Sequence, residues 1–210
     1  MNLSKVTLTK ASPTVSLTKQ GSATGQVRVN LNWNARPSGG GGGGMMGKLL
    51  GGGGGAQSLD LDLGCLYELN DGDKGVIQAL GRSFGDLNRP PFIMLDGDDR
   101  SGSSVGGENL LINLNHLAAI RRILVFAYIY EGAPSWDKAQ GVVTLYPASG
   151  PEIEIRLDEN AGGARFCAIA MFENHGGELS LRREVRYING SQKDVDAAYG
   201  WGMRWSGARK

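Results

Sequence analysis

Acidic side chains, glycines and serines crowd into one stretch near the middle of the chain, L-D-G-D-D-R-S-G-S-S-V-G-G-E-N at residues 95–109. Carboxylates this close repel one another unless a cation or a basic group neutralises them. Ca²⁺ prefers oxygen ligands, and glycines let a loop fold tightly around an ion. We therefore interpret this stretch as half of a Ca²⁺ site, with oxygen donors from Asp96, Asp98, Asp99, Glu108 and Asn109.

A second acidic motif, L-D-L-D-L at residues 59–63, has the alternation of a strand. Asp60 and Asp62 would leave the same face, with Cβ atoms about 6.6–7 Å apart, while the leucines point into the core. That spacing lets two carboxylates bracket one ion at Ca²⁺–O distances of about 2.3–2.6 Å. Because Ca²⁺ takes roughly six to eight oxygen ligands, we expect the stretch at 95–109 to complete the site.

Other readings of the acidic stretch remain open. It is not an EF-hand, because, counted from Asp96, Arg100 occupies the third ligand position and Ser101 stands where a glycine is required. Mg²⁺ is a weaker candidate, since it keeps several waters in an octahedral shell. Alternatively, the acids cap turns and pair with Arg82 or Arg100 without any metal.

The elements that would position these residues are strands. Alternation of polar and apolar residues over 5–10, 14–19, 26–33 and 59–69 indicates half-buried strands. The most hydrophobic run, 123–130, is typical of a central strand buried on both faces. Further strands are expected at 76–80, 92–95, 110–114, 141–146, 152–157, 164–172 and 179–187, and short helical turns at 115–120 and 192–199. The pattern predicts an all-β fold, a β-sandwich of two mainly antiparallel sheets with a few short helical turns.

Length and composition indicate one domain over residues 1–210. Residues 38–58 are almost wholly glycine, and such a stretch buries too little apolar surface to offset its ordering entropy. Because strand patterns continue on both sides, we expect a flexible glycine-rich loop inserted within the domain. Cys65 and Cys167 each lie in an apolar strand-like segment, which favours reduced, buried thiols.

Charge and hydropathy restrict the partners and the location. With 22 basic and 21 acidic side chains the net charge is +1, which gives no reason to expect a nucleic-acid partner. No apolar run approaches the roughly 20 residues of a membrane span, and the first residues lack the organisation of a signal peptide. We expect a cytoplasmic protein, with peripheral association at the inner face of the membrane as a further option.

Catalytic motifs are missing from the sequence. His116 and His175 stand in no nucleophile-elbow or metalloprotease pattern, and no phosphate-loop or dinucleotide motif occurs. Cys65 and Cys167 form no C-x-x-C pair, and Ca²⁺ is redox-inert. We therefore expect no enzymatic activity and no catalytic residues.

Motifs along nearly the whole chain resemble the tellurium-resistance TerD/TerA family of bacterial stress proteins. They are V-S-L-T-K at 15–19, V-R-V-N-L-N-W at 27–33, L-D-L-D-L-G-C at 59–65, G-D-D-R-S-G…G-E-N-L at 97–110 and Y-G-W-G at 199–202. The two acidic motifs are the specific part. TerD-type members carry two aspartates where this chain has Gly106 and Gly107, so it resembles the TerA-like branch more closely.

The resemblance implies a Ca²⁺-binding β-sandwich linked to resistance to tellurite and other stresses. Carried over by position, the ligands are Asp60, Asp62, Asp98, Asp99 and Glu108, and the glycines at 106 and 107 favour one Ca²⁺ site over two. We expect a Ca²⁺-dependent module that binds other stress-response or tellurium-resistance proteins. The alternative is a Ca²⁺-dependent binder of a carbohydrate or phospholipid headgroup, for which Trp136 and Trp201 are candidate contact residues.

Overall fold

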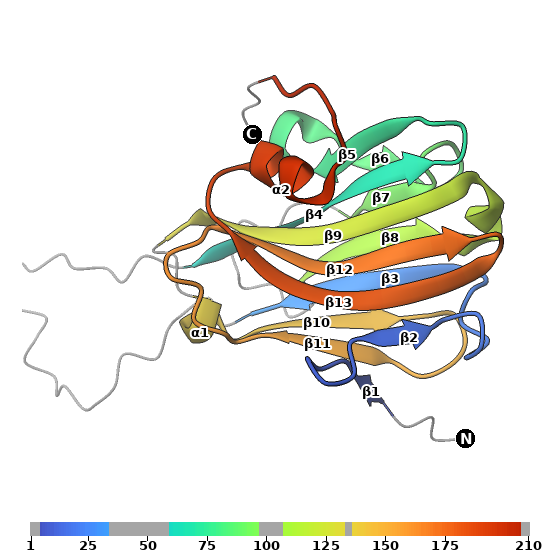
Figure 1. The fold of residues 1–210 in the computed structure, drawn as a ribbon, viewed down its shortest axis with the longest axis horizontal. Helices are drawn as coiled ribbons and strands as arrows, with labels where there is room; N and C mark the ends of the chain where they lie inside the picture. Colours follow the sequence, from blue (N-terminus) through green and yellow to red (C-terminus); the bar gives the residue numbers. More distant parts are fainter. Residues whose placement is uncertain (1–4, 34–58, 97–106, 133–135, 207–210) are drawn as a thin grey trace, which may run out of the picture.

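The computed structural model describes residues 5–33, 59–96, 107–132 and 136–206, which form two β-sheets packed face to face (Figure 1). The predicted all-β sandwich is confirmed. The predicted glycine-rich loop at 38–58 lies outside the described residues. No helix of the described chain is long and apolar enough to cross a membrane.

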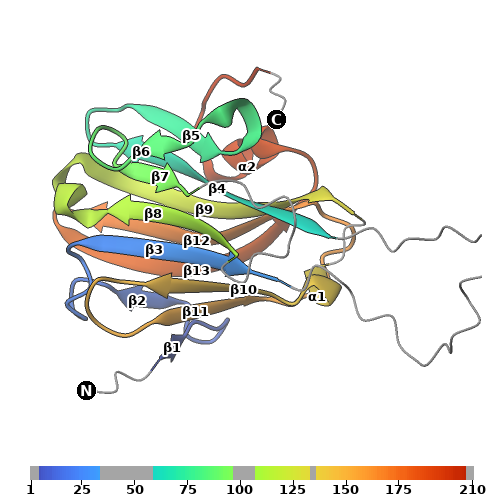
Figure 2. The same cartoon turned by 180° about the vertical axis from the view of Figure 1, so that it is seen from behind.

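One sheet has seven strands in the order β1-β11-β10-β3-β8-β7-β6, and its outer face is turned toward the viewer in Figure 2. All neighbouring strands run antiparallel except β1 and β11, which are parallel. In that order the strands span Val6–Thr7, Ile153–Leu157, Gly141–Tyr146, Gln26–Asn32, Glu108–Asn113, Ile93–Leu95 and Gly85–Asp86.

The second sheet has six strands in the order β2-β13-β12-β9-β4-β5, all antiparallel to their neighbours. They span Thr14–Ser16, Glu178–Ile188, Phe166–His175, Ile120–Glu131, Asp60–Leu69 and Lys74–Gln78. The helical elements are α1 (Trp136–Ala139), α2 (Gln192–Tyr199) and two 3₁₀ turns at Leu80–Arg82 and Leu114–Ala119.

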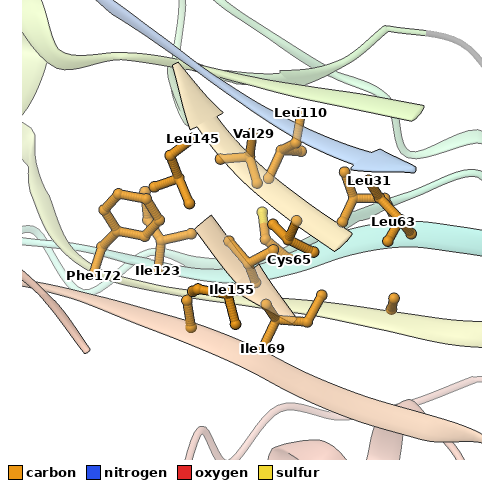
Figure 3. Close-up of a cluster of buried hydrophobic side chains, with 14 of the residues drawn as sticks. Val29, Leu31, Leu63, Cys65, Leu110, Ile123, Leu145, Ile155, Ile169 and Phe172 are labelled. Atoms are coloured by element: carbon orange, nitrogen blue, oxygen red, sulfur yellow. The ribbon is translucent and has the colours of Figure 1, made fainter. Parts of the chain in front are cut away.

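The main core fills the space between the sheets, and it forms because alternate residues of each strand are apolar. Figure 3 shows part of it, where residues such as Val29 and Leu110 of one sheet meet Leu63, Cys65 and Phe172 of the other. Each of these side chains is at most 1% exposed. Full burial of one such side chain contributes about 1.5–3 kcal/mol, so this layer supplies most of the driving force for folding.

A second apolar layer covers the outer face of the six-stranded sheet. There Phe126 and Tyr128 of β9 pack with Val195 of α2 and with Trp201 of the segment that follows it. Strands β4 and β9 are therefore buried on both faces, as predicted for the run at 123–130. Gly64 belongs to this layer: a Cβ at this position would stand 2.9 Å from the Phe126 ring, so no larger residue fits the motif there.

The segment after α2 is held by one buried carboxylate. Asp196 accepts hydrogen bonds from the backbone amides of Gly202 and Met203, at 2.7 and 2.9 Å, and from the indole N–H of Trp205 at 2.7 Å. Trp201 donates its own indole N–H to the Tyr67 carbonyl at 2.9 Å. These bonds fix the aromatic-glycine motif against β4 and the outer apolar layer.

Most of the predicted elements are present, with differences at the ends of the chain and at short turns. The helix predicted at 192–199 is α2, and the turn predicted at 115–120 is the 3₁₀ turn Leu114–Ala119. The first two predicted strands, 5–10 and 14–19, are shorter in the structure, Val6–Thr7 and Thr14–Ser16, because each pairs with a neighbouring strand over only a few residues. Sequence patterns gave no sign of α1 or of the two-residue β6.

A buried ion network ties β4 to β9 on the outer face of the six-stranded sheet. Glu68, 3% exposed, accepts hydrogen bonds from Arg122 at 2.6 Å and Arg121 at 2.8 Å, and lies 3.7 Å from the Lys74 ammonium. Burial alone would raise the pKa of Glu68, but Arg122, Lys74 and Arg121 outweigh it and hold the pKa below its ordinary value. The Arg122 guanidinium also stacks 3.8 Å from the Trp201 ring.

Replacing Glu68 with Gln should destabilise the protein by about 2 kcal/mol at pH 7, because the neutral amide loses the charge-assisted bonds from the arginines. The folded-state pKa lies below the ordinary value of 4.5, so this stabilisation is present above that pH and is lost as the pH falls through the folded-state pKa. Urea unfolding from about pH 7 down to about pH 2 measures the difference. Glu178→Gln, at an exposed position, is the control; a gap between Glu68→Gln and wild type that does not narrow in acid would contradict the assignment.

Candidate metal centre

The two aspartates of the L-D-L-D-L motif lie at the start of β4 and are both buried. Asp60 is 7% exposed and Asp62 is 0% exposed. Leu61 and Leu63 point into the core between the sheets, as predicted, so Asp62 lies on the outer face of the six-stranded sheet, while Asp60 precedes a shift in the register against β9. On the neighbouring strand β9, Asp60 lies opposite Glu131 and Asp62 lies opposite Tyr128.

Glu108 reaches this strand from the other sheet. It is the first residue of β8, shares the inward face with Leu110 and Ile112, and is 2% exposed. Its carboxylate accepts a hydrogen bond of 2.5 Å from the backbone amide of Leu63. The ladder between β4 and β5 begins at Gly64, so the first four residues of β4 extend beyond it and leave this amide to Glu108.

Three buried carboxylates, Asp60, Asp62 and Glu108, therefore lie on strands β4 and β8, which the hydrogen bond between Leu63 and Glu108 joins. Burial favours the neutral form of a carboxyl group, and like charges opposite one another across strands are destabilising, as for Asp60 and Glu131. A divalent cation would offset both costs. The oxygen donors of Asp60, Asp62 and Glu108 are of the type that hard cations such as Ca²⁺ prefer.

The side chains of Asn109 and Asp96 do not lie beside the Glu108 carboxylate. Asn109 follows Glu108 on β8 and so points to the outer face of the seven-stranded sheet, where its Oδ1 accepts from Arg28 at 3.1 Å and from Asn30 at 3.0 Å. Asp96 is exposed, and its backbone amide donates to the Asn109 carbonyl at 2.8 Å. If either residue contributed to an ion bound by Glu108, it would do so through a backbone oxygen and not through its side chain.

Asp98 and Asp99 lie outside the described residues, so their predicted role as ligands stays a prediction. Among residues 5–33, 59–96, 107–132 and 136–206, no group of three or more acidic, histidine or cysteine side chains is placed so that it could hold a metal ion. The described carboxylates are oxygen donors at one end of the sandwich, with Asp62 on the outer face of the six-stranded sheet and Glu108 facing inward from the other sheet. The rest of the coordination shell would have to come from the segment 97–106 and from water.

Gly107 explains one departure from the TerD-type motif. Its φ is +62°, in the left-handed region, and a Cβ there would lie 2.1 Å from the Leu31 carbonyl oxygen. No aspartate side chain fits at this position without moving β3 or the start of β8. The strand packing that places Glu108 therefore excludes a further carboxylate at residue 107.

The other candidate groups take structural positions. The free thiols of Cys65 and Cys167 are buried, as predicted, and burial raises the pKa of both thiols. His116 stacks on Phe92 with ring centroids 4.0 Å apart. Trp136 and Trp201 are 0% and 1% exposed, so neither is available to contact a ligand, contrary to their candidacy.

Sequence patterns missed two residues beside the aspartates, Glu131 and Tyr128. Both belong to β9, and only the register of β9 against β4 brings them opposite Asp60 and Asp62. A third neighbour, Tyr130, is 40% exposed and is the one large hydrophobic residue of the described chain with such exposure. The end of the sandwich that holds the buried carboxylates thus also presents an aromatic side chain to solvent.

Comparison with known proteins agrees with the motifs. No family model matches the chain. It is 44% identical over all 210 residues to the tellurium resistance protein TerA of an Alcaligenes species, and it spans 60% of that protein's length. Two solved structures share the fold. One is SAV2460, a protein of unknown function, with a TM-score of 0.57 and 16% identity over 87% of this chain and 99% of that one. The other is a homologue of the telluride resistance protein TerD from Streptomyces coelicolor A3(2), with a TM-score of 0.56 and 20% identity over 83% of this chain and 95% of that one.

Replacing Gly107 with Ala should destabilise the protein by about 1–3 kcal/mol more than the same change at Gly176, because both have left-handed backbones but only Gly107 faces a close backbone oxygen. Urea unfolding of the two variants measures the difference. Equal losses of stability would show that the approach of Leu31 to residue 107 is not as tight as described.

Proposed function

We propose, from the premise that this chain is related along its whole length to the tellurium resistance protein TerA, that it is a Ca²⁺-binding stress-response module that binds other proteins in its Ca²⁺-loaded form. It would act by binding and not by catalysis. The observation that carries the proposal is the Glu108 carboxylate, which is buried and accepts a hydrogen bond from the amide of Leu63, the residue after Asp62 on β4.

Chain connectivity supports a shared site. The segment that bears Asp98 and Asp99 runs between β7 and β8, and its two ends are joined by the hydrogen bond from the Asp96 amide to the Asn109 carbonyl. Its last residue precedes Gly107 and Glu108 directly. An ion that takes oxygens from Glu108 and from this segment would neutralise charge on both.

Such an ion gives a physical basis for a Ca²⁺-dependent partner. Binding would change the charge of one end of the sandwich, next to the exposed ring of Tyr130. A partner that contacts this end would therefore distinguish the loaded from the empty protein. We propose other tellurium-resistance or stress-response proteins as partners, in the cytoplasm or at the inner face of the membrane.

Ca²⁺ should raise the melting temperature of the protein, because a ligand that binds the native state stabilises it by about 2.7 kcal/mol at a hundredfold excess over Kd. Thermal melts in millimolar Ca²⁺ and in chelator measure the shift. Asp62→Asn and Asp98→Asn should abolish it, whereas Asp71→Asn, the same change in an exposed turn, should keep it. Superimposed melts of the wild-type protein with and without Ca²⁺ would exclude the site.

The partner class is tested by retention from a bacterial lysate on the immobilised protein, with Ca²⁺ or with chelator. Specific proteins that are retained in Ca²⁺ and lost from Asp62→Asn would support a protein-binding module. Parallel assays with phosphatidylserine liposomes and with a glycan array separate the alternatives: Ca²⁺-dependent retention of either, without a protein partner, would overturn the proposed partner class and leave the Ca²⁺ site standing.

A further inference from the structure

The outer face of the seven-stranded sheet carries a row of polar residues. Strand register places Glu154 of β11 beside Thr144 of β10, Thr144 beside Asn30 of β3, and Asn30 beside Asn109 of β8. Asn30, Thr144 and Glu154 are each 7% exposed. Polar side chains on an outer sheet face are usually solvated, so a buried row of them is unusual.

Longer side chains wall in this row. Glu154 forms ion pairs with Lys5 on one side and with Arg156, at 3.1 Å, on the other. The Arg28 guanidinium stacks 4.0 Å from the Tyr146 ring and donates to Asn109 at 3.1 Å. The short polar residues form a floor and the long ones form rims, and hydrogen bonds and ion pairs hold the rims in place.

A pocket of about 370 Å³ lies over this floor, and the residues that line it include Asn30, Asn32, Thr144, Tyr146 and Gln140. A second pocket of about 450 Å³ shares Gln140 and Val142 with the first. Together they follow β10 from Gln140 to Tyr146, about 20 Å at the rise of a strand. Figure 2 shows this face toward the viewer, with β10 between β11 and β3. The volume is within the usual range of small-ligand sites.

The chemistry of the lining selects the class of ligand. Lys5 and Glu154 are the charged residues that line the first pocket, and they neutralise each other, so neither an anion nor a cation is favoured there. The second pocket is charged, with Asp137, Arg156 and Asp158 in its lining, so the ligand is assigned to the first. Amide and hydroxyl side chains both donate and accept hydrogen bonds, as the hydroxyl groups of a sugar do. Tyr146 adds an aromatic ring, and because Arg28 covers one face of it, the C–H face of a pyranose would pack against the other.

We propose that this groove, defined by Asn30, Asn32, Gln140, Thr144 and Tyr146, binds a short neutral saccharide without Ca²⁺. The proposal does not rest on the proposed function, because the carboxylates proposed for Ca²⁺ lie elsewhere: Asp60 and Asp62 belong to β4 of the opposite sheet, and Glu108 points inward from β8.

The test is an NMR titration of the ¹⁵N-labelled protein with chitotriose, cellotriose and maltotriose, to about 10 mM and in EDTA. At least one trisaccharide should shift the amide signals of Thr144, Tyr146 and Asn32 in a saturable way. Tyr146→Ala and Asn32→Ala should weaken that binding about tenfold, the effect of losing roughly one good contact. Asn32 is exposed, so its variant tests the groove without disturbing the core. Tyr130→Ala, near the end of β9 beside the aspartates of β4, is the matched aromatic control, and this variant should bind the sugar as the wild-type protein does.

Three results would overturn the proposal. The first is no shift with any of the three sugars, and the second is unchanged binding by Tyr146→Ala and Asn32→Ala. The third is a shift seen in Ca²⁺ and lost in EDTA, because it would place the sugar at the acidic site and not on this face. Failure of the Ca²⁺-dependent melt leaves this titration unaffected, so the two proposals fail separately.

Discussion

The hydrogen bond from the Leu63 amide to the Glu108 carboxylate joins the two sheets at the end of the sandwich where the buried carboxylates lie. It exists because β4 extends past the end of its ladder with β5, and because β8 begins with an inward-facing glutamate above the apolar core. An acceptor that carries charge makes this bond stronger than a neutral one, while its burial makes the charge costly. The proposed Ca²⁺ site follows from this combination of a fixed position and a buried charge.

The rest of the architecture holds β4 in place so that the bond can form. Leu61, Leu63 and Leu69 are packed between the sheets, and the other face of β4, which bears Leu66, is covered through Phe126, α2 and Trp201. Burial on both faces fixes the register of β4 against β9, because a slip by one residue would exchange the leucines and the aspartates between the two faces. The Asp196 carboxylate secures the cover by holding the segment that contains Trp201 and Trp205. Stability of the fold and placement of the aspartates thus depend on the same strand.

Sequence patterns predicted the sandwich, most of its strands, α2 and the inward-facing Leu61 and Leu63, because the spacing of apolar residues is a local property of the chain. Contacts between distant segments were beyond those patterns. The bond between Glu108 and Leu63, the position of Glu131 opposite Asp60 and the burial of Trp136 all depend on which strands become neighbours. The prediction that Asn109 accompanies Glu108 as a side-chain ligand neglected the alternation that its own strand imposes. Gly107 marks a close backbone approach, which a single sequence does not distinguish from an ordinary flexible loop.

Isothermal titration calorimetry of Ca²⁺ into the wild-type protein and into Glu108→Gln tests the central claim most directly. The change keeps the size of the side chain and an acceptor for the Leu63 amide, while it removes the buried charge. The account predicts that one Ca²⁺ binds the wild-type protein and that the variant, still folded, binds it at least tenfold more weakly, by about 1.4 kcal/mol or more. Equal Ca²⁺ binding by the two proteins, or no binding by either, would contradict it.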